Sequence, residues 1–129
     1  MSTDGWKDVD PEFVLEAVRS GAFQVIDLRT PFEYASHHIR GAMLLPIQVL
    51  EDLVDAVERD KPTIFVCEHA NRSTLACRML SGMFRELYNM KGGMELWLKK
   101  GYEVATGMDE LGERWLRHLE EKNQGRTSS

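Results

Sequence analysis

Apolar residues along this chain follow two patterns: short continuous runs, and longer stretches in which they recur every three or four residues. A short apolar run bounded by turn residues predicts a strand that is buried on both faces of a sheet. The clearest run is Thr-Ile-Phe-Val at residues 63–66, after the turn-forming Asp60-Lys61-Pro62. Residues 6–9 fit either a short first strand or an extended lead-in. The other predicted strands are residues 23–28, 42–45 and 86–90.

Helical spacing marks the stretches between these runs. Asp10-Pro11-Glu12 combines an N-cap, a proline at the first helical position and an acidic first turn, and it predicts a helix that Gly21 ends. Thr30-Pro31 starts a short helix through Ser36 in the same way. Further helices are predicted at residues 47–59, 73–82 and 94–100. A last amphipathic helix is predicted at residues 109–122, with an apolar stripe of Met108, Leu111, Trp115 and Leu119.

Strands that alternate with helices predict an α/β fold, in which a mostly parallel central sheet carries helices on both faces. We expect residues 1–105 to form this domain. The helix within residues 106–122 is expected to pack on the domain or on a partner, including a second copy in a homodimer. The polar residues 123–129 are expected to be a disordered tail.

Size and composition narrow the function classes. The 129 residues suit one domain, and 43% hydrophobic content is ordinary for a globular protein. A net charge of -5 without a Lys/Arg run argues against nucleic-acid and anionic-membrane partners. The chain shows neither an apolar stretch of membrane-spanning length nor the features of a signal peptide. Two cysteines, Cys67 and Cys77, make no disulfide framework and favour a reducing, cytoplasmic location.

The segment with the strongest chemical signal is the Cys67 loop, residues 67–73. Cys67 ends the central predicted strand, a polar loop follows, and helical spacing begins at Ser73. In parallel sheets, sites lie at the carboxyl ends of strands, and the free amides and dipole of a helix N-terminus stabilise an anion such as a thiolate. Arg72 adds a permanent cation. The competing interpretation is a buried structural cysteine, which the surrounding polar residues disfavour.

Other polar residues have plainer interpretations. Asp27 and Arg29, at a strand end, are predicted to form a structural brace that includes Glu33, and His38 is predicted to brace the turn around Gly41. His69 either assists proton transfer or is an exposed bystander. His37, His38, Cys67 and His69 match no common zinc-ligand spacing, so no metal site is predicted. Trp97 and Cys77 are expected in the core.

Three blocks of sequence carry a family resemblance. Residues 25–46 contain Asp-x-Arg, a glutamate in the following helix and a His-Ile-x-Gly-Ala turn; residues 67–73 form the cysteine loop; residues 87–104 contain Gly-Gly-x-x-x-Trp. Together, and in this order, they closely resemble the rhodanese (sulfurtransferase) family. His37, Arg40 and Ala70 replace residues that are commonly Gly, Pro and Gly there.

The resemblance implies a rhodanese-like fold and a sulfurtransferase without a cofactor. Cys67 and Arg72 would be catalytic: Cys67 would take a sulfane sulfur from thiosulfate or a persulfide donor and pass it to a thiol or a protein acceptor. Loop amides from Glu68 to Arg72 would stabilise the Cys67 persulfide. The remaining substrate-binding positions would be His69, Ala70, Asn71 and Ser73. Glu68 stands where many members carry a cation, which predicts weak use of thiosulfate.

Two alternatives remain at this point. Phosphatases and arsenate reductases of the same fold have a loop one residue longer than the four residues that separate Cys67 from Arg72. The shorter loop makes a smaller cradle and favours sulfur over phosphate. The rival from another class is a non-catalytic rhodanese-like module that binds a partner or senses oxidation.

Overall fold

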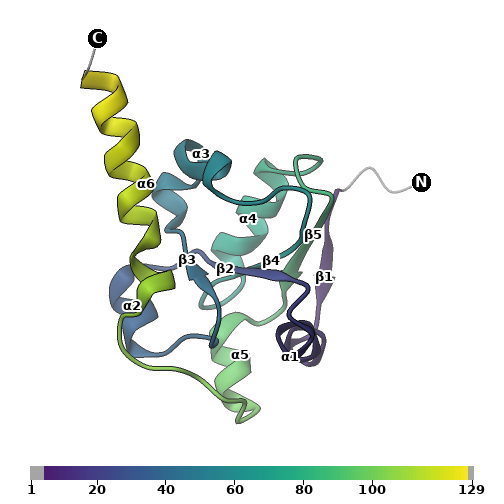
Figure 1. Cartoon of the computed structure of the whole chain (residues 1–129). Coiled ribbons are helices and arrows are strands. Elements are labelled where there is room, and N and C mark those ends of the chain that lie inside the picture. The colour runs from purple at the N-terminus through teal and green to yellow at the C-terminus, as the bar shows by residue number, and fades with distance from the viewer. Residues whose placement is uncertain (1–4, 128–129) are drawn as a thin grey trace.

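A five-stranded sheet forms the centre of the computed structural model, which describes residues 5–127 (Figure 1). The strands are β1 (Lys7–Val9), β2 (Gln24–Asp27), β3 (Met43–Leu44), β4 (Pro62–Val66) and β5 (Glu86–Met90). Every pair is parallel, in the order β1-β5-β4-β2-β3. Residues 7–9 are thus a true first strand and not a lead-in. The α/β fold predicted from the sequence is confirmed.

Alternate residues of the central strands face two separate cores. Ile26, Phe65 and Leu87 belong to one hydrophobic cluster, and Val25, Ile64 and Val66 to the other. The first cluster is covered by α3 (Leu50–Leu53) and α4 (Asn71–Met79), the second by α1 (Pro11–Ser20) and α5 (Gly93–Lys99). Figure 1 shows these helices on opposite sides of the sheet. Trp97 and Cys77 are buried in these cores, as predicted.

The strand order brings two segments together that are distant in sequence. β2 and β4 are neighbours, with Asp27 opposite Val66, and the Leu28 amide continues the pairing to the Val66 carbonyl at 2.9 Å. The chain after each strand therefore emerges at the same edge of the sheet. One segment leads into α2 (Pro31–Ser36), and the other is the Cys67 loop.

The predicted helix at residues 47–59 is wrong as a continuous element. The segment instead consists of a 3₁₀ turn at Ile47–Val49, the single α-turn of α3, and a second 3₁₀ turn at Val54–Ala56. Leu50, Leu53 and Val57 are buried in the core, so the apolar spacing correctly predicted which residues are buried. The β-branched residues have low helix propensity, and packing of these side chains decides the backbone instead.

The last helix, α6 (Glu110–Thr127), is longer than predicted. The prediction of disorder from residue 123 is wrong for residues 123–127, and residues 128–129 lie outside the described range. Each residue added to an existing helix gains a hydrogen bond, so a polar sequence without proline does not by itself end the helix. Trp115 and Leu119 of α6 pack on the core of their own chain, and α6 contacts β3. Within residues 5–127, none of the helices has the length and apolar character needed to cross a bilayer.

Candidate active site

Cys67 lies directly after β4 with its side chain against Ser73. The residue is 1% exposed. Its thiol donates to the Ser73 hydroxyl at 3.3 Å, and the Ser73 amide donates to the sulfur at 3.2 Å. Ser73 itself is fully buried in the first turns of α4. The sulfur is buried but has hydrogen-bonding neighbours, which a purely structural core cysteine does not need.

The loop reverses direction at Ala70. This residue has φ of 70°, and it is the single non-glycine residue with positive φ in the described range. It precedes α4, which starts at Asn71, two residues earlier than predicted. Thr74 fixes the turn, because both its amide and its hydroxyl donate to the Ala70 carbonyl, at 3.1 and 2.6 Å. A β-carbon in this conformation costs about 1–2 kcal/mol, so the loop holds local strain.

Backbone amides at the start of α5 hold the same loop from the other side. The Met94 amide donates to the Cys67 carbonyl at 2.8 Å, and the Glu95 amide donates to the Glu68 carbonyl at 3.1 Å. Gly93 permits this approach: it has φ of 61°, and a β-carbon there would lie 2.3 Å from the Glu68 carbonyl oxygen. The glycine pair in the Gly-Gly-x-x-x-Trp block was the signal in the sequence for this close backbone contact.

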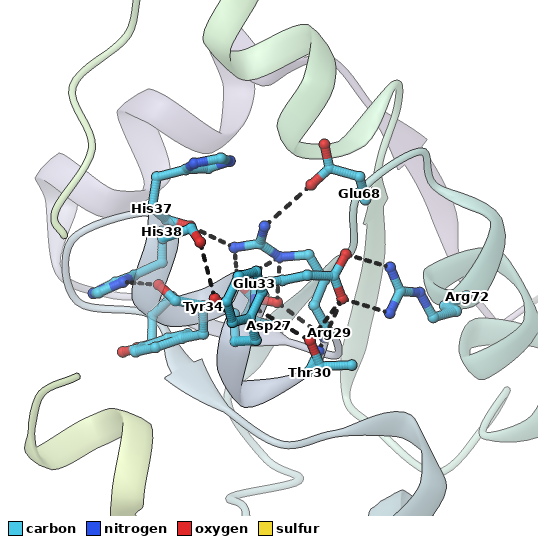
Figure 2. A network of polar contacts seen from close by, with 12 residues as sticks. Asp27, Arg29, Thr30, Glu33, Tyr34, His37, His38, Glu68 and Arg72 are labelled. Atoms are coloured by element: carbon cyan, nitrogen blue, oxygen red, sulfur yellow. Dashed lines mark hydrogen bonds and ion pairs between the residues drawn. The ribbon is translucent and has the colours of Figure 1, made fainter. Parts of the chain in front are cut away.

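The predicted brace around Asp27 and Arg29 exists, and it reaches the loop. The Arg29 guanidinium is buried, binds both Asp27 carboxylate oxygens, and donates to the His37 carbonyl at 2.6 Å and to the Glu68 carboxylate at 3.1 Å. Figure 2 shows it pointing between the His37 carbonyl and Glu68. Burial lowers the pKa of Arg29, but the hydrogen bond and charge of Asp27, with Glu68 and Glu33, outweigh it and raise the pKa.

Glu33 differs from its predicted place. Its hydrogen bonds join it to Arg72 and Thr30 rather than to Asp27 or Arg29 (Figure 2). The Arg72 guanidinium donates to both Glu33 carboxylate oxygens, at 2.9 and 3.0 Å. The Thr30 amide donates to the same carboxylate. Thr30 and Glu33 form the capping box of α2. The bond from Arg72, helped by Thr30, lowers the pKa of Glu33 to about 2 despite partial burial. Arg72 is therefore held against α2 by a bidentate pair.

Charges in this cluster do not favour a small anion. Three carboxylates, those of Asp27, Glu33 and Glu68, surround the two guanidinium groups of Arg29 and Arg72. Both cations already have carboxylate partners. A dianion that approaches Cys67 therefore meets a cluster whose positive charge is fully compensated.

His38 and His69 contact different parts of the structure. His38 bonds to the Tyr34 carbonyl at 2.7 Å and to the Asp109 carboxylate at 2.9 Å, so it ties α2 to the start of α6 and not to the turn around Gly41. His69, at the loop, pairs with Glu95 at 2.5 Å, and both side chains are exposed. The described residues contain no group of three or more His, Cys, Asp or Glu side chains placed to hold a metal ion.

With this geometry established, known proteins identify the fold. Residues 10–100 match the family model of the rhodanese-like domain. The thiosulfate sulfurtransferase GlpE of Pseudomonas putida is 37% identical over 93 residues, which cover 71% of this chain and 84% of that protein. This chain belongs to the rhodanese family.

Two further proteins are similar to this rhodanese over most of its length. GlpE of Pseudomonas aeruginosa is 33% identical over 109 residues, covering 84% of this chain and 97% of that protein. A rhodanese-related protein from Thermoplasma volcanium has a crystal structure that matches with a TM-score of 0.72 at 30% identity. That match covers 78% of this chain and 98% of the other. The resemblance read from the three sequence blocks is thereby confirmed.

The resting Cys67 sulfur of this rhodanese has a backbone amide donor of its own. In the described part of the chain, the amide that donates to the Cys67 sulfur is that of Ser73, and no hydrogen bond joins the amides of residues 68–72 to it. Sequence reasoning also missed Asn89 and Asp8, which connect to Ser73. The available signal was a polar Asn inside the apolar strand at residues 86–90.

Proposed function

We propose that this rhodanese is a sulfurtransferase that carries a sulfane sulfur on Cys67. The observation that carries the proposal is the position of the Cys67 sulfur: it lies at the carboxyl end of β4, within a loop where only four residues separate it from Arg72. Support comes from the relatives, which are named thiosulfate sulfurtransferases and match over most of their length. A thiosulfate, persulfide or related sulfane sulfur donor is therefore the proposed substrate class.

The reaction has two steps. The Cys67 thiolate attacks the outer sulfur of the donor, the donor's sulfur–sulfur bond breaks, and the leaving group (sulfite from thiosulfate, a thiolate from a persulfide) departs with the electron pair. An acceptor thiolate then attacks the terminal sulfur of the Cys67 persulfide. A new persulfide leaves on the acceptor, and the Cys67 thiolate is restored. Each step moves one neutral sulfur atom, so no external oxidant or reductant is needed.

The amides of residues 68–72 do not bond the resting Cys67 sulfur, but they can act on the persulfide. The charge of the persulfide lies on the outer sulfur, one bond beyond the atom that the Ser73 amide contacts. The amides of residues 68–72 belong to the loop that directly follows Cys67. We infer that they stabilise the terminal sulfur anion rather than the resting thiol, by the logic of an oxyanion hole.

The compensated charges around Cys67 favour particular donors. Glu68 is next to the nucleophile in sequence, and its carboxylate is held by Arg29. We propose that thiosulfate is used weakly and that persulfides, which carry less negative charge, are the better donors. Cysteine thiols on small molecules or proteins are the proposed acceptors.

Sulfur loading tests the assignment directly. After incubation with thiosulfate or a low-molecular-weight persulfide, intact-mass spectrometry should show a gain of one sulfur atom, and peptide mapping should place it on Cys67. Cys67→Ser should lose the gain, whereas the matched Cys77→Ser should keep it, because burial raises the pKa of Cys77 to about 12 and keeps that thiol protonated. Equal loading of wild type and Cys67→Ser would overturn the assignment.

The alternatives make different predictions in the same preparation. A non-catalytic binding or redox-sensing module would take up no sulfur, or would not pass it to an acceptor thiol. A phosphatase would hydrolyse a generic aryl phosphate. The two free thiols support a reducing, cytoplasmic location. A homodimer through α6 has less support, since Trp115 and Leu119 pack on their own chain while Leu116 remains exposed.

A further inference from the structure

A chain of hydrogen bonds runs from the Cys67 sulfur away from the loop and across the sheet. Cys67 donates to the Ser73 hydroxyl at 3.3 Å, Ser73 donates to the Asn89 side-chain oxygen in a short contact, and the Asn89 amide group donates to Asp8 at 2.8 Å. Cys67, Ser73 and Asn89 are each at most 2% exposed. We call Ser73, Asn89 and Asp8 the Asn89 relay. Its members come from α4, β5 and β1, and none is among the hydrogen-bond partners of Arg29 within residues 5–127.

The acceptors at the far end fix the direction of every bond in the relay. The Asp8 carboxylate accepts only, so the Asn89 nitrogen must face it. The second proton on that nitrogen goes to the Thr74 hydroxyl oxygen at 3.2 Å, because the Thr74 proton is already given to the Ala70 carbonyl. The Asn89 oxygen is therefore left for Ser73. Ser73 has one hydroxyl proton, Asn89 receives it, and a lone pair of the hydroxyl faces the sulfur.

This polarity suits the thiol form of Cys67 and not the thiolate. A thiol has a proton for the Ser73 lone pair. A thiolate has none, and the hydroxyl proton that could stabilise it is engaged at Asn89. To donate to the thiolate, Ser73 would have to leave a buried Asn89 oxygen without a partner, which is unfavourable.

We propose that Asn89, oriented by Asp8, is a positioning residue that sets the fraction of Cys67 present as thiolate, by holding the Ser73 hydroxyl proton away from the sulfur. The proposal rests on the proposed function, in which the thiolate is the attacking species. In this proposal, the relay lowers the reactivity of the resting cysteine by lowering its thiolate fraction. The charged and ionisable groups near Cys67 that remain unchanged in the test are Arg72, Glu33, Asp27, Arg29, Glu68 and Cys77.

The test is the rate of Cys67 alkylation by iodoacetamide as a function of pH, measured on the full chain with the modified cysteine located by peptide mapping. The midpoint of this profile reports the thiol–thiolate equilibrium, whereas the absolute rate also depends on access. Asn89→Leu frees the Ser73 hydroxyl, and the exposed Asp8→Asn lets the Asn89 amide turn over. Both should move the midpoint to lower pH by about half to one unit, the equivalent of one hydrogen bond.

A Ser73→Ala background separates the relay from simpler explanations. If the effect passes through the hydroxyl, neither substitution shifts the midpoint once Ser73 is alanine. A shift from Asp8→Asn that persists there would show a plain charge effect and overturn the proposal. Asp10→Asn, which makes the same charge change on an exposed neighbour, should leave the midpoint in place. Unchanged midpoints in Asn89→Leu and Asp8→Asn would also overturn it.

These outcomes are independent of sulfur transfer. Alkylation measures the acidity of Cys67 even in a protein that carries no sulfur, so a failed sulfur-loading experiment and a failed relay experiment are distinguishable. Asp8→Asn keeps the proposal falsifiable if Asn89→Leu does not fold, because Asp8 lies on the exposed surface of the edge strand β1.

Discussion

The Cys67 loop is held on two sides by different kinds of interaction. On one side are ion pairs: Arg29 with Asp27 and Glu68, and Arg72 with Glu33. On the other side are neutral hydrogen bonds, from the backbone amides at the start of α5 and from Ser73, whose hydroxyl is engaged by Asn89. We propose that the charged side governs which donors approach Cys67, and its Glu33–Arg72 pair links the loop to α2. The neutral side contacts the Cys67 sulfur and the Cys67 carbonyl, and we propose that it sets the state of the nucleophile.

Removing Arg29 should break the charged side most severely. Arg29→Leu leaves the Asp27 carboxylate buried without its partner, and breaking a buried ion pair in this way typically costs about 3–5 kcal/mol. Urea denaturation measures the loss in the free energy of unfolding. The matched control is Arg40→Leu, which breaks the exposed pair with Glu103 and should cost less than about 1 kcal/mol. Similar losses in the two variants would mean that the buried Asp27–Arg29 pair contributes no more to stability than an exposed ion pair.

The corresponding break on the neutral side is Gly93→Ala. The new β-carbon would meet the Cys67 and Glu68 carbonyl oxygens at 2.5 and 2.3 Å, so the loop must move away from α5. We expect a loss of about 2–3 kcal/mol in stability together with loss of sulfur loading. Gly101→Ala is the control, because Gly101 also has positive φ but no atom within 4 Å of the added carbon. It should cost about 1 kcal/mol and leave loading intact.

Donor choice is predicted to respond to the charged side alone. Glu68→Lys removes a carboxylate beside the nucleophile, and we expect kcat/KM for thiosulfate to rise about tenfold, the equivalent of about 1.4 kcal/mol. Glu68→Gln separates the loss of the negative charge from the gain of a positive one and should give a smaller rise. Turnover with a low-molecular-weight persulfide donor, which carries less negative charge than thiosulfate, should change less in either variant. No gain with thiosulfate in Glu68→Lys would show that charge at this position does not limit donor use.

The difference between the two sides also explains which parts could be predicted from the sequence. The strands, Cys67 at the end of β4, and the Asp27–Arg29 brace follow from local patterns, because residues close in sequence make them. The Glu33–Arg72 pair and the Asn89 relay join residues that are far apart, and only the order of the strands brings them together. The broken helix at residues 47–59 has a similar cause, since burial of Leu50 and Leu53 against the sheet decides its backbone.

The smallest expected effect concerns the ion pair between α2 and Arg72. In the folded protein Arg72 lowers the pKa of Glu33 from 4.5 to about 2. A carboxylate with a lowered folded-state pKa contributes stability above the unfolded value, and that contribution disappears as the pH falls from about 4.5 to about 2. Glu33→Gln should therefore lose about 1 kcal/mol at pH 7, after allowance for the partial exposure of the pair.

The pH dependence of this loss separates the ion pair from the capping role of the same residue. The gap in unfolding free energy between wild type and Glu33→Gln should narrow toward pH 3, because below about pH 4.5 the unfolded wild type binds a proton at Glu33 that the folded protein, with its lowered pKa, does not. Glu16→Gln removes an exposed ion pair with Arg19, and its unfolding free energy should differ from that of the wild type by close to zero at both pH 7 and pH 3. Gln keeps the ability to accept from Thr30, so the helix cap survives in the variant. A gap that stays constant from pH 7 to pH 3 would place the contribution of Glu33 in packing and capping, and it would leave Arg72 positioned by the loop alone.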